Sequence, residues 1–145
     1  MEALALWKVA PMKSEYGESF VGEGVNAAHI NTVLGNREGA VGTAWATGLA
    51  TPSVGHTRFV AVAAPNQPLQ PMTLFVNKAT IETEEHGALT WGAAQHGVAR
   101  GVQRARDNGV FGASDLHELA LIVAVWVNPL ADDAGQVEDN NAEAT

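Results

Sequence analysis

Residues 119–127 have the sequence LALIVAVWV, an unbroken apolar run that decides the fold class. The run is too short for a membrane-spanning helix, which needs about 20 apolar residues. Valine and isoleucine are enriched in it, and both favour extended structure. We therefore expect a central β-strand that is covered on both faces, with the rest of the chain arranged around it.

The segment before this strand predicts the longest helix, over residues 82–108. Thr83 is expected to cap it, Glu84 and Glu85 suit its first turn, and Gly109 suits its end. Small residues recur every four positions along the helix and would let another backbone approach closely. The expected partner is the protein's own sheet or a neighbouring subunit. The residues of this small-residue stripe are Ala93, Gly97, Gly101 and Ala105.

The remaining segments predict shorter elements. Apolar runs between turn residues indicate strands over 18–21, 27–34, 58–64 and 72–81, and a short helix over 41–50. The resulting order, β-β-α-β-β-α-β, predicts an α/β (α+β) fold with helices packed on one mixed sheet. We expect one domain over residues 17–130, between a lead-in at 1–16 and an acidic C-terminal segment at 131–145.

Charge and composition exclude several classes of function. The 145 residues include 16 acidic and 8 basic side chains, a net charge of -8, which argues against a nucleic-acid partner because such proteins need cationic contacts to phosphate. The absence of cysteine excludes disulfides, thiolate catalysis and cysteine-bound metals. Histidine spacing typical of a metal site is also missing, so we expect no metal. Without a secretory signal or a membrane span, the expected location is cytoplasmic.

The acidic C-terminal segment, residues 131–145, contains no basic residue. It has few large apolar side chains, so it is expected to be weakly ordered unless its central part forms a short helix. Because it holds five of the acidic residues, the rest of the chain is closer to neutral. These five are Asp132, Asp133, Glu138, Asp139 and Glu143.

Two pairs of polar residues on strand faces are candidates for chemistry. His29 and Asn31 project from one face of the strand at 27–34, just after the Gly22–Gly24 turn. His29 is either a half-buried structural histidine or a general acid or base, since imidazole gains and loses a proton near neutral pH. Lys78 and Thr80 form the second pair. The lysine either extends its ammonium to solvent, binds an anionic or carbonyl group, or acts as an amine nucleophile.

Three other residues have less distinctive surroundings. Gln95 lies beside an apolar helix face and is either an ordinary boundary residue or an amide donor to a heterocyclic ligand. His86 and His117 stand among polar residues and are expected on the surface.

Several segments, in this order, resemble the formaldehyde-activating enzyme family. They are GESFVGEG at 17–24, AAHIN at 27–31, GHT at 55–57, AVAAPN at 61–66, TLFVNKAT at 73–80 and GAAQHGVA at 92–99. The resemblance implies an α/β fold like the second domain of ribosomal protein S5. It also implies condensation of formaldehyde with the co-substrate tetrahydromethanopterin, with no bound cofactor, in a homopentamer that holds the pterin between adjacent subunits.

The resemblance also implies roles for single residues. His29 stands at the family's proton-donor position, and the substrate-binding positions hold Asn31, Val60, Lys78, Thr80 and Gln95. Val60 replaces a leucine, and Asn31 replaces the usual aspartate, whose charge could hold the pterin or support a protonated His29. At the C-terminus, NNAEAT at 140–145 lacks the family's two tyrosines.

These departures leave three hypotheses open. The chain is an active formaldehyde-activating enzyme with His29 as general acid, or a non-catalytic protein that binds or senses formaldehyde or a pterin. The third hypothesis is an enzyme that uses another reduced pterin as the amine acceptor.

Overall fold

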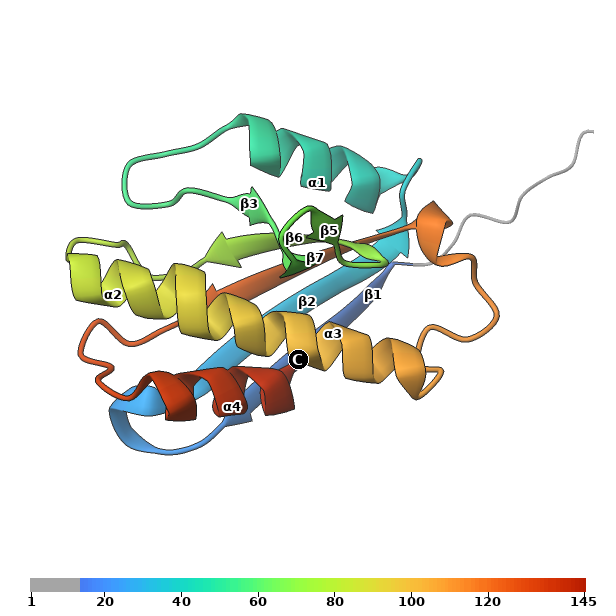
Figure 1. The fold of residues 1–145 in the computed structure, drawn as a ribbon. Helices are drawn as coiled ribbons and strands as arrows, with labels where there is room; N and C mark the ends of the chain where they lie inside the picture. Colours follow the sequence, from blue (N-terminus) through green and yellow to red (C-terminus); the bar gives the residue numbers. More distant parts are fainter. Residues whose placement is uncertain (1–13) are drawn as a thin grey trace, which may run out of the picture.

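In the computed structural model, which describes residues 14–145, one five-stranded sheet has helices on both faces (Figure 1). The strand order is β1-β2-β7-β6-β3; β6 and β7 are parallel, and the other neighbours are antiparallel. The mixed α/β class is confirmed, whereas the specific likeness to ribosomal protein S5 stays a prediction. The strands are β1 (Glu15–Val21), β2 (Ala28–Asn36), β3 (Phe59–Val60), β6 (Met72–Asn77) and β7 (Leu119–Trp126).

The apolar run at 119–127 forms the central strand, as predicted. Leu119, Val123 and Val125 are at most 1% exposed, and they belong to the face of β7 that packs on the long helix. On the other face Ile122 lies beneath helix α1 (Ala40–Ala50), while Trp126 is only half-buried. The second face of the sheet is therefore covered at one end and open at the other.

The long helix follows the prediction closely. It consists of α2 (Glu84–Ala88), a π-helical stretch (Leu89–Ala94) and α3 (Gln95–Asp107). The Thr83 side chain accepts a hydrogen bond from the His86 backbone N–H at 3.2 Å, and Gly109 has a φ of +72° just after the last turn. A crossover of this kind is what two adjacent parallel strands, β6 and β7, require.

The acidic C-terminal segment forms a helix, α4 (Ala134–Ala144), which lies beside α3 (Figure 1). Asp133 caps it by accepting a hydrogen bond from the Gln136 backbone N–H at 3.0 Å, and this bond lowers the pKa of Asp133. Arg100 on α3 holds Glu138 at 2.7 Å and Asp139 at 2.8 Å. Of the two alternatives for this segment, the structure therefore has the helix.

The partner expected for the small-residue stripe was wrong. Gly97 packs against the backbone of α4 at Glu138, and Gly101 packs against Thr145, so at its two glycines the stripe faces the C-terminal segment and not the sheet. Glycine allows this because a Cβ at either position would overlap α4.

Two of the strand predictions were wrong in detail. The strand at 58–64 is divided into β3 and β4 (Val62–Ala64) because buried Ala61 hydrogen-bonds to both Thr73 and Leu69; β4 pairs with β5 (Gln67–Pro68). The strand at 72–81 ends at Asn77, whose side chain donates to the carbonyl oxygens of Gly55 and Ala79.

His86 was expected on the surface but is 3% exposed, because α2 packs against the end of β7. Its Nε2 lies 2.9 Å from the Val127 carbonyl oxygen. His117 is exposed, as predicted. Of the predicted lead-in, residues 1–13 lie outside the described part of the chain. Across residues 14–145, none of the helices is both long and apolar enough to cross a bilayer.

Candidate functional site

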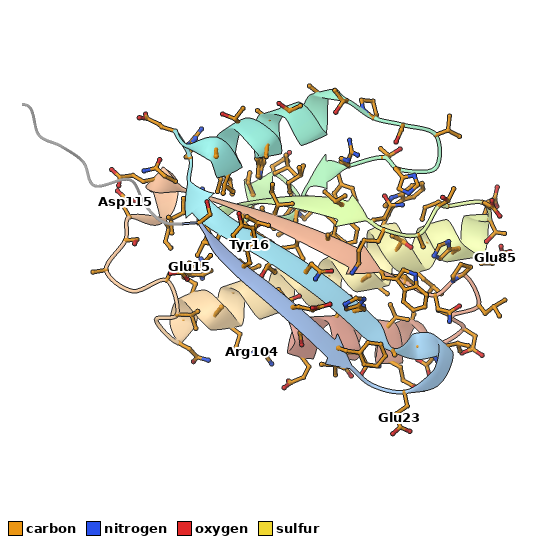
Figure 2. All side chains as sticks on the ribbon, turned by 180° about the vertical axis from the view of Figure 1, so that it is seen from behind. Glu15, Tyr16, Glu23, Glu85, Arg104 and Asp115 are labelled. Carbon is orange, nitrogen blue, oxygen red and sulfur yellow. The ribbon has the colours of Figure 1, made fainter. Side chains whose placement is uncertain are left out.

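The candidate site lies on the open end of the sheet face that α1 covers only in part. Strand register places Glu18, Asn31 and Ala124 side by side on this face, with Phe20, His29 and Trp126 in the next row. Figure 2 shows the sheet from this side, with Tyr16 on β1 and Glu23 at the turn into β2. Tyr16 and Phe20 are 79% and 65% exposed. The face is therefore a shallow aromatic surface around a polar centre.

The turn between β1 and β2 sets this register. Gly22 and Gly24 have φ values of +87° and +66°, which residues with a Cβ rarely adopt. A Cβ on Gly22 would also lie 2.5 Å from the side-chain nitrogen of Asn140 on α4. Asn140 donates in turn to the Asn26 carbonyl oxygen at 2.9 Å, so the C-terminal helix holds the turn in place.

Four side chains form a hydrogen-bonded cluster, which we call the His29 cluster: Glu18, His29, Asn31 and Lys78. His29 Nε2 lies 2.7 Å from Glu18 Oε1, and His29 Nδ1 lies 3.3 Å from Lys78 Nζ. Lys78 Nζ also donates to Asn31 Oδ1 at 2.7 Å. The imidazole thus joins a carboxylate on one side to an amine on the other, and its side chain is 35% exposed.

The electrostatics of the cluster follow from these contacts. Hydrogen bonds from His29 and Asn31 lower the pKa of Glu18, so its carboxylate stays ionised beside the imidazole. Burial of Lys78 lowers the pKa of its amine, against a smaller opposing effect from the Glu18 charge. The cluster therefore places an ionised carboxylate and a lysine whose ammonium form is disfavoured by burial on either side of the imidazole.

The structure brings together three of the six predicted site residues: His29, Asn31 and Lys78. In residues 14–145, no hydrogen bond links Val60, Thr80 or Gln95 to the His29 cluster. Gln95 begins α3 in the helix layer on the opposite face, and its amide donates to the Val62 carbonyl oxygen at 2.9 Å.

Val60 belongs to the sheet itself, and Thr80 lies just after one of its strands. Val60 pairs with Leu74 and so shares the α1 side, while Thr80 follows β6 beside Gly55. The predicted pterin-binding residues are thus distributed over both faces of the sheet.

Sequence reasoning missed Glu18. Its signal was the Gly22–Gly24 turn: in a hairpin, residues at matched distances from the turn face each other, and the observed register pairs Glu18 with Asn31 and Phe20 with His29. Among residues 14–145, no group of three or more His, Asp or Glu side chains is arranged to hold a metal ion.

Comparison with known proteins identifies relatives over most of this chain. The family model described as formaldehyde-activating enzyme (Fae) matches residues 16–145. The 5,6,7,8-tetrahydromethanopterin hydro-lyase of Methanosarcina barkeri is 40% identical over 134 residues, which are 92% of this chain and 75% of that protein.

Longer relatives match as well. The bifunctional enzyme Fae/Hps of Methanosphaera stadtmanae is 37% identical over 131 residues, which are 90% of this chain and 32% of that protein. The enzyme of the same name from Methanoculleus marisnigri is 38% identical over 121 residues, 83% of this chain and 31% of its own. The chain thus spans about a third of these bifunctional relatives. Because the family model matches residues 16–145, which include the whole His29 cluster and nearly all of the described fold, this chain belongs to the formaldehyde-activating enzyme family.

Proposed function

We propose that this chain condenses formaldehyde with tetrahydromethanopterin, giving methylene-tetrahydromethanopterin and water, with His29 as the general acid. The observation that carries the proposal is the His29 cluster, in a chain that is 40% identical to a tetrahydromethanopterin hydro-lyase. The imidazole is partly exposed, touches a carboxylate, and lies on an open aromatic surface on which a flat heterocycle could stack.

The chemistry of the condensation needs an acid at this point. Formaldehyde and a secondary amine first form a carbinolamine, whose hydroxyl must leave as water before a second nitrogen can close the ring. A proton donated to that hydroxyl speeds its departure. The Glu18 carboxylate lies 2.7 Å from His29 Nε2 and orients the imidazole that would donate this proton.

Asn31 and Lys78 would then bind the reacting end of the substrates, and Val60, Thr80 and Gln95 the rest of the pterin. In one chain these residues occupy both faces of the sheet, so a single ligand cannot touch them all. A site between adjacent subunits of a homopentamer solves this, because each subunit contributes a different face. The exposure of Tyr16 and Phe20 around the cluster supports a surface that a second copy covers.

We expect a homopentamer in solution, with a mass about five times the 15.2 kDa of one chain. Size-exclusion chromatography with light scattering measures this directly. Replacing Phe20 by Glu should shift the mass towards the single chain, because a charge would be buried in an apolar contact. The matched control is Val54→Glu, at a loop residue 97% exposed. A wild-type protein that is monomeric at every concentration would contradict the intersubunit site.

The function itself is tested by mixing formaldehyde and tetrahydromethanopterin with and without the protein, and following methylene-tetrahydromethanopterin formation. We expect a rate above that of the uncatalysed reaction. Thermal melts add a second readout, since a ligand at 100 times its Kd stabilises the folded state by about 2.7 kcal/mol. Stabilisation by pterin without any acceleration would instead favour a binding protein, the second hypothesis, and would reject catalysis. A cytoplasmic location stays part of the proposal.

A further inference from the structure

The contact between His29 and Lys78 has room for one proton only. Nδ1 of the imidazole and Nζ of the lysine face each other at 3.3 Å, and His29 Nε2 is occupied by Glu18. If the lysine is an ammonium, Nδ1 must be the acceptor and the imidazole is neutral. If the imidazole carries both protons, Nδ1 donates and the lysine must be a free amine.

The surroundings of the pair favour the second arrangement. The Glu18 carboxylate touches the imidazole, whereas Lys78 has the neutral amide oxygen of Asn31 as its other partner, at 2.7 Å. Burial acts against the ammonium and lowers the pKa of Lys78. The cluster thus has the arrangement of an activated nucleophile: an amine within hydrogen-bond reach of an acid–base group that a third group orients.

From this geometry we propose that Lys78 is a catalytic nucleophile that captures formaldehyde before the carbon reaches the pterin. The transfer of the carbon to a pterin rests on the proposed function, but the capture of formaldehyde by Lys78 needs formaldehyde alone. It assigns to Lys78 a covalent role in place of simple ligand binding.

The step balances without an oxidant or a reductant. The Lys78 amine adds to formaldehyde to give a carbinolamine, and the proton on His29 Nδ1 lets its hydroxyl leave as water, which yields an iminium carbon on Nζ. A secondary amine of the acceptor attacks that carbon and loses its proton to His29. His29 returns that proton to Nζ, which leaves as the free amine when the acceptor's second nitrogen attacks the carbon. The second nitrogen then loses its own proton to His29, which completes the methylene bridge.

The chain offers an unusually clean test, because its only other lysines are Lys8 and Lys13. The full-length protein is exposed briefly to isotope-labelled formaldehyde and cyanoborohydride near neutral pH, and the methylation of each lysine is read by peptide mass spectrometry. We expect Lys78 to be methylated at least about tenfold faster than Lys8 or Lys13, since general acid–base assistance from His29 should speed its reaction. Equal rates at the three lysines would overturn the proposal.

Variants extend the test to the neighbours of Lys78. Glu18→Gln should slow Lys78 methylation about tenfold, through loss of a charge-assisted hydrogen bond to the imidazole. Glu15→Gln is the matched control, because Glu15 is on the same strand but faces the other side of the sheet. Asn31→Asp should also slow it, since a carboxylate 2.7 Å from Nζ favours the ammonium. Methylation that is unchanged in both Glu18→Gln and Asn31→Asp would contradict the mechanism.

Turnover separates this inference from the proposed function. Lys78→Gln keeps an uncharged side chain that can donate to Asn31 but cannot form an iminium, so we expect kcat to fall to the background rate while pterin binding, measured as Kd, changes little. Wild-type turnover without preferential labelling of Lys78 would overturn the inference and leave the proposed function standing. Preferential labelling of Lys78 in a protein without turnover would support the capture of formaldehyde by Lys78 and overturn the proposed function.

Discussion

His29→Ala should lose most of the acceleration that the wild type gives to methylene-tetrahydromethanopterin formation, a fall of about 10²- to 10⁴-fold in kcat. The variant removes the acid that lets water leave, and it also breaks the link between Glu18 and Lys78. With the imidazole gone, Lys78 keeps only Asn31 as a hydrogen-bond partner in the cluster. The measurement is the initial rate at saturating pterin, corrected for the uncatalysed reaction.

The control for His29→Ala is His96→Ala. His96 is also a histidine bound to a glutamate, Glu138 at 3.1 Å, but it lies on α3 in the helix layer. We expect its kcat to equal that of the wild type. Because the His29 side chain is 35% exposed, its loss should change the free energy of unfolding by only about 0.5 kcal/mol, so a melting curve separates catalysis from folding. A His29→Ala protein with wild-type kcat would reject the general-acid role.

The central strand and the main helix could be predicted from the sequence because their signals are local. The apolar run at 119–127 leaves little choice except a buried strand, and Thr83 and Gly109 mark the two ends of the long helix by their own chemistry. Strand periodicity also placed His29 and Asn31 on one face, which the register confirms.

What the sequence could not supply is long-range pairing. The position of Glu18 opposite Asn31 depends on where the hairpin begins, and a shift of one residue would move it to the other face. The contact between Lys78 and His29 joins β6 to β2 across β7, so it depends on the order of strands in the sheet. The burial of His86 likewise depends on where α2 packs against β7.

The C-terminal helix is the clearest case of tertiary structure outweighing composition. Its sequence is acidic and has few apolar residues, yet Val137 and Ala142 are 2% and 4% exposed. The helix packs closely against two glycines of α3 and forms ion pairs with Arg100. Its N-terminal end is held by Asn26, which accepts hydrogen bonds from the Asp132 and Asp133 backbone N–H groups. None of these partners lies near it in the sequence.

Gly97→Ala should therefore destabilise the fold by about 1–3 kcal/mol, the usual cost of forcing an extra methyl into a packed contact. The new Cβ would overlap the Glu138 carbonyl oxygen and lie 2.9 Å from the Asn141 Cβ. Both are fixed parts of α4, so the helix must move away from α3. Urea unfolding followed by circular dichroism gives the change in free energy.

Gly92→Ala is the matched control for this prediction. Gly92 belongs to the same continuous helix, but a Cβ there has no atom within 4 Å, so helix propensity should make the variant more stable by up to about 1 kcal/mol. The two alanines differ only in what they face, and the difference between them measures the contact between α3 and α4. Equal stability of Gly97→Ala and Gly92→Ala would mean that α4 is not held against α3.

Because Asn140 on α4 supports the turn that sets the register of Glu18 and His29, a displaced α4 should also slow turnover in Gly97→Ala, but not in Gly92→Ala.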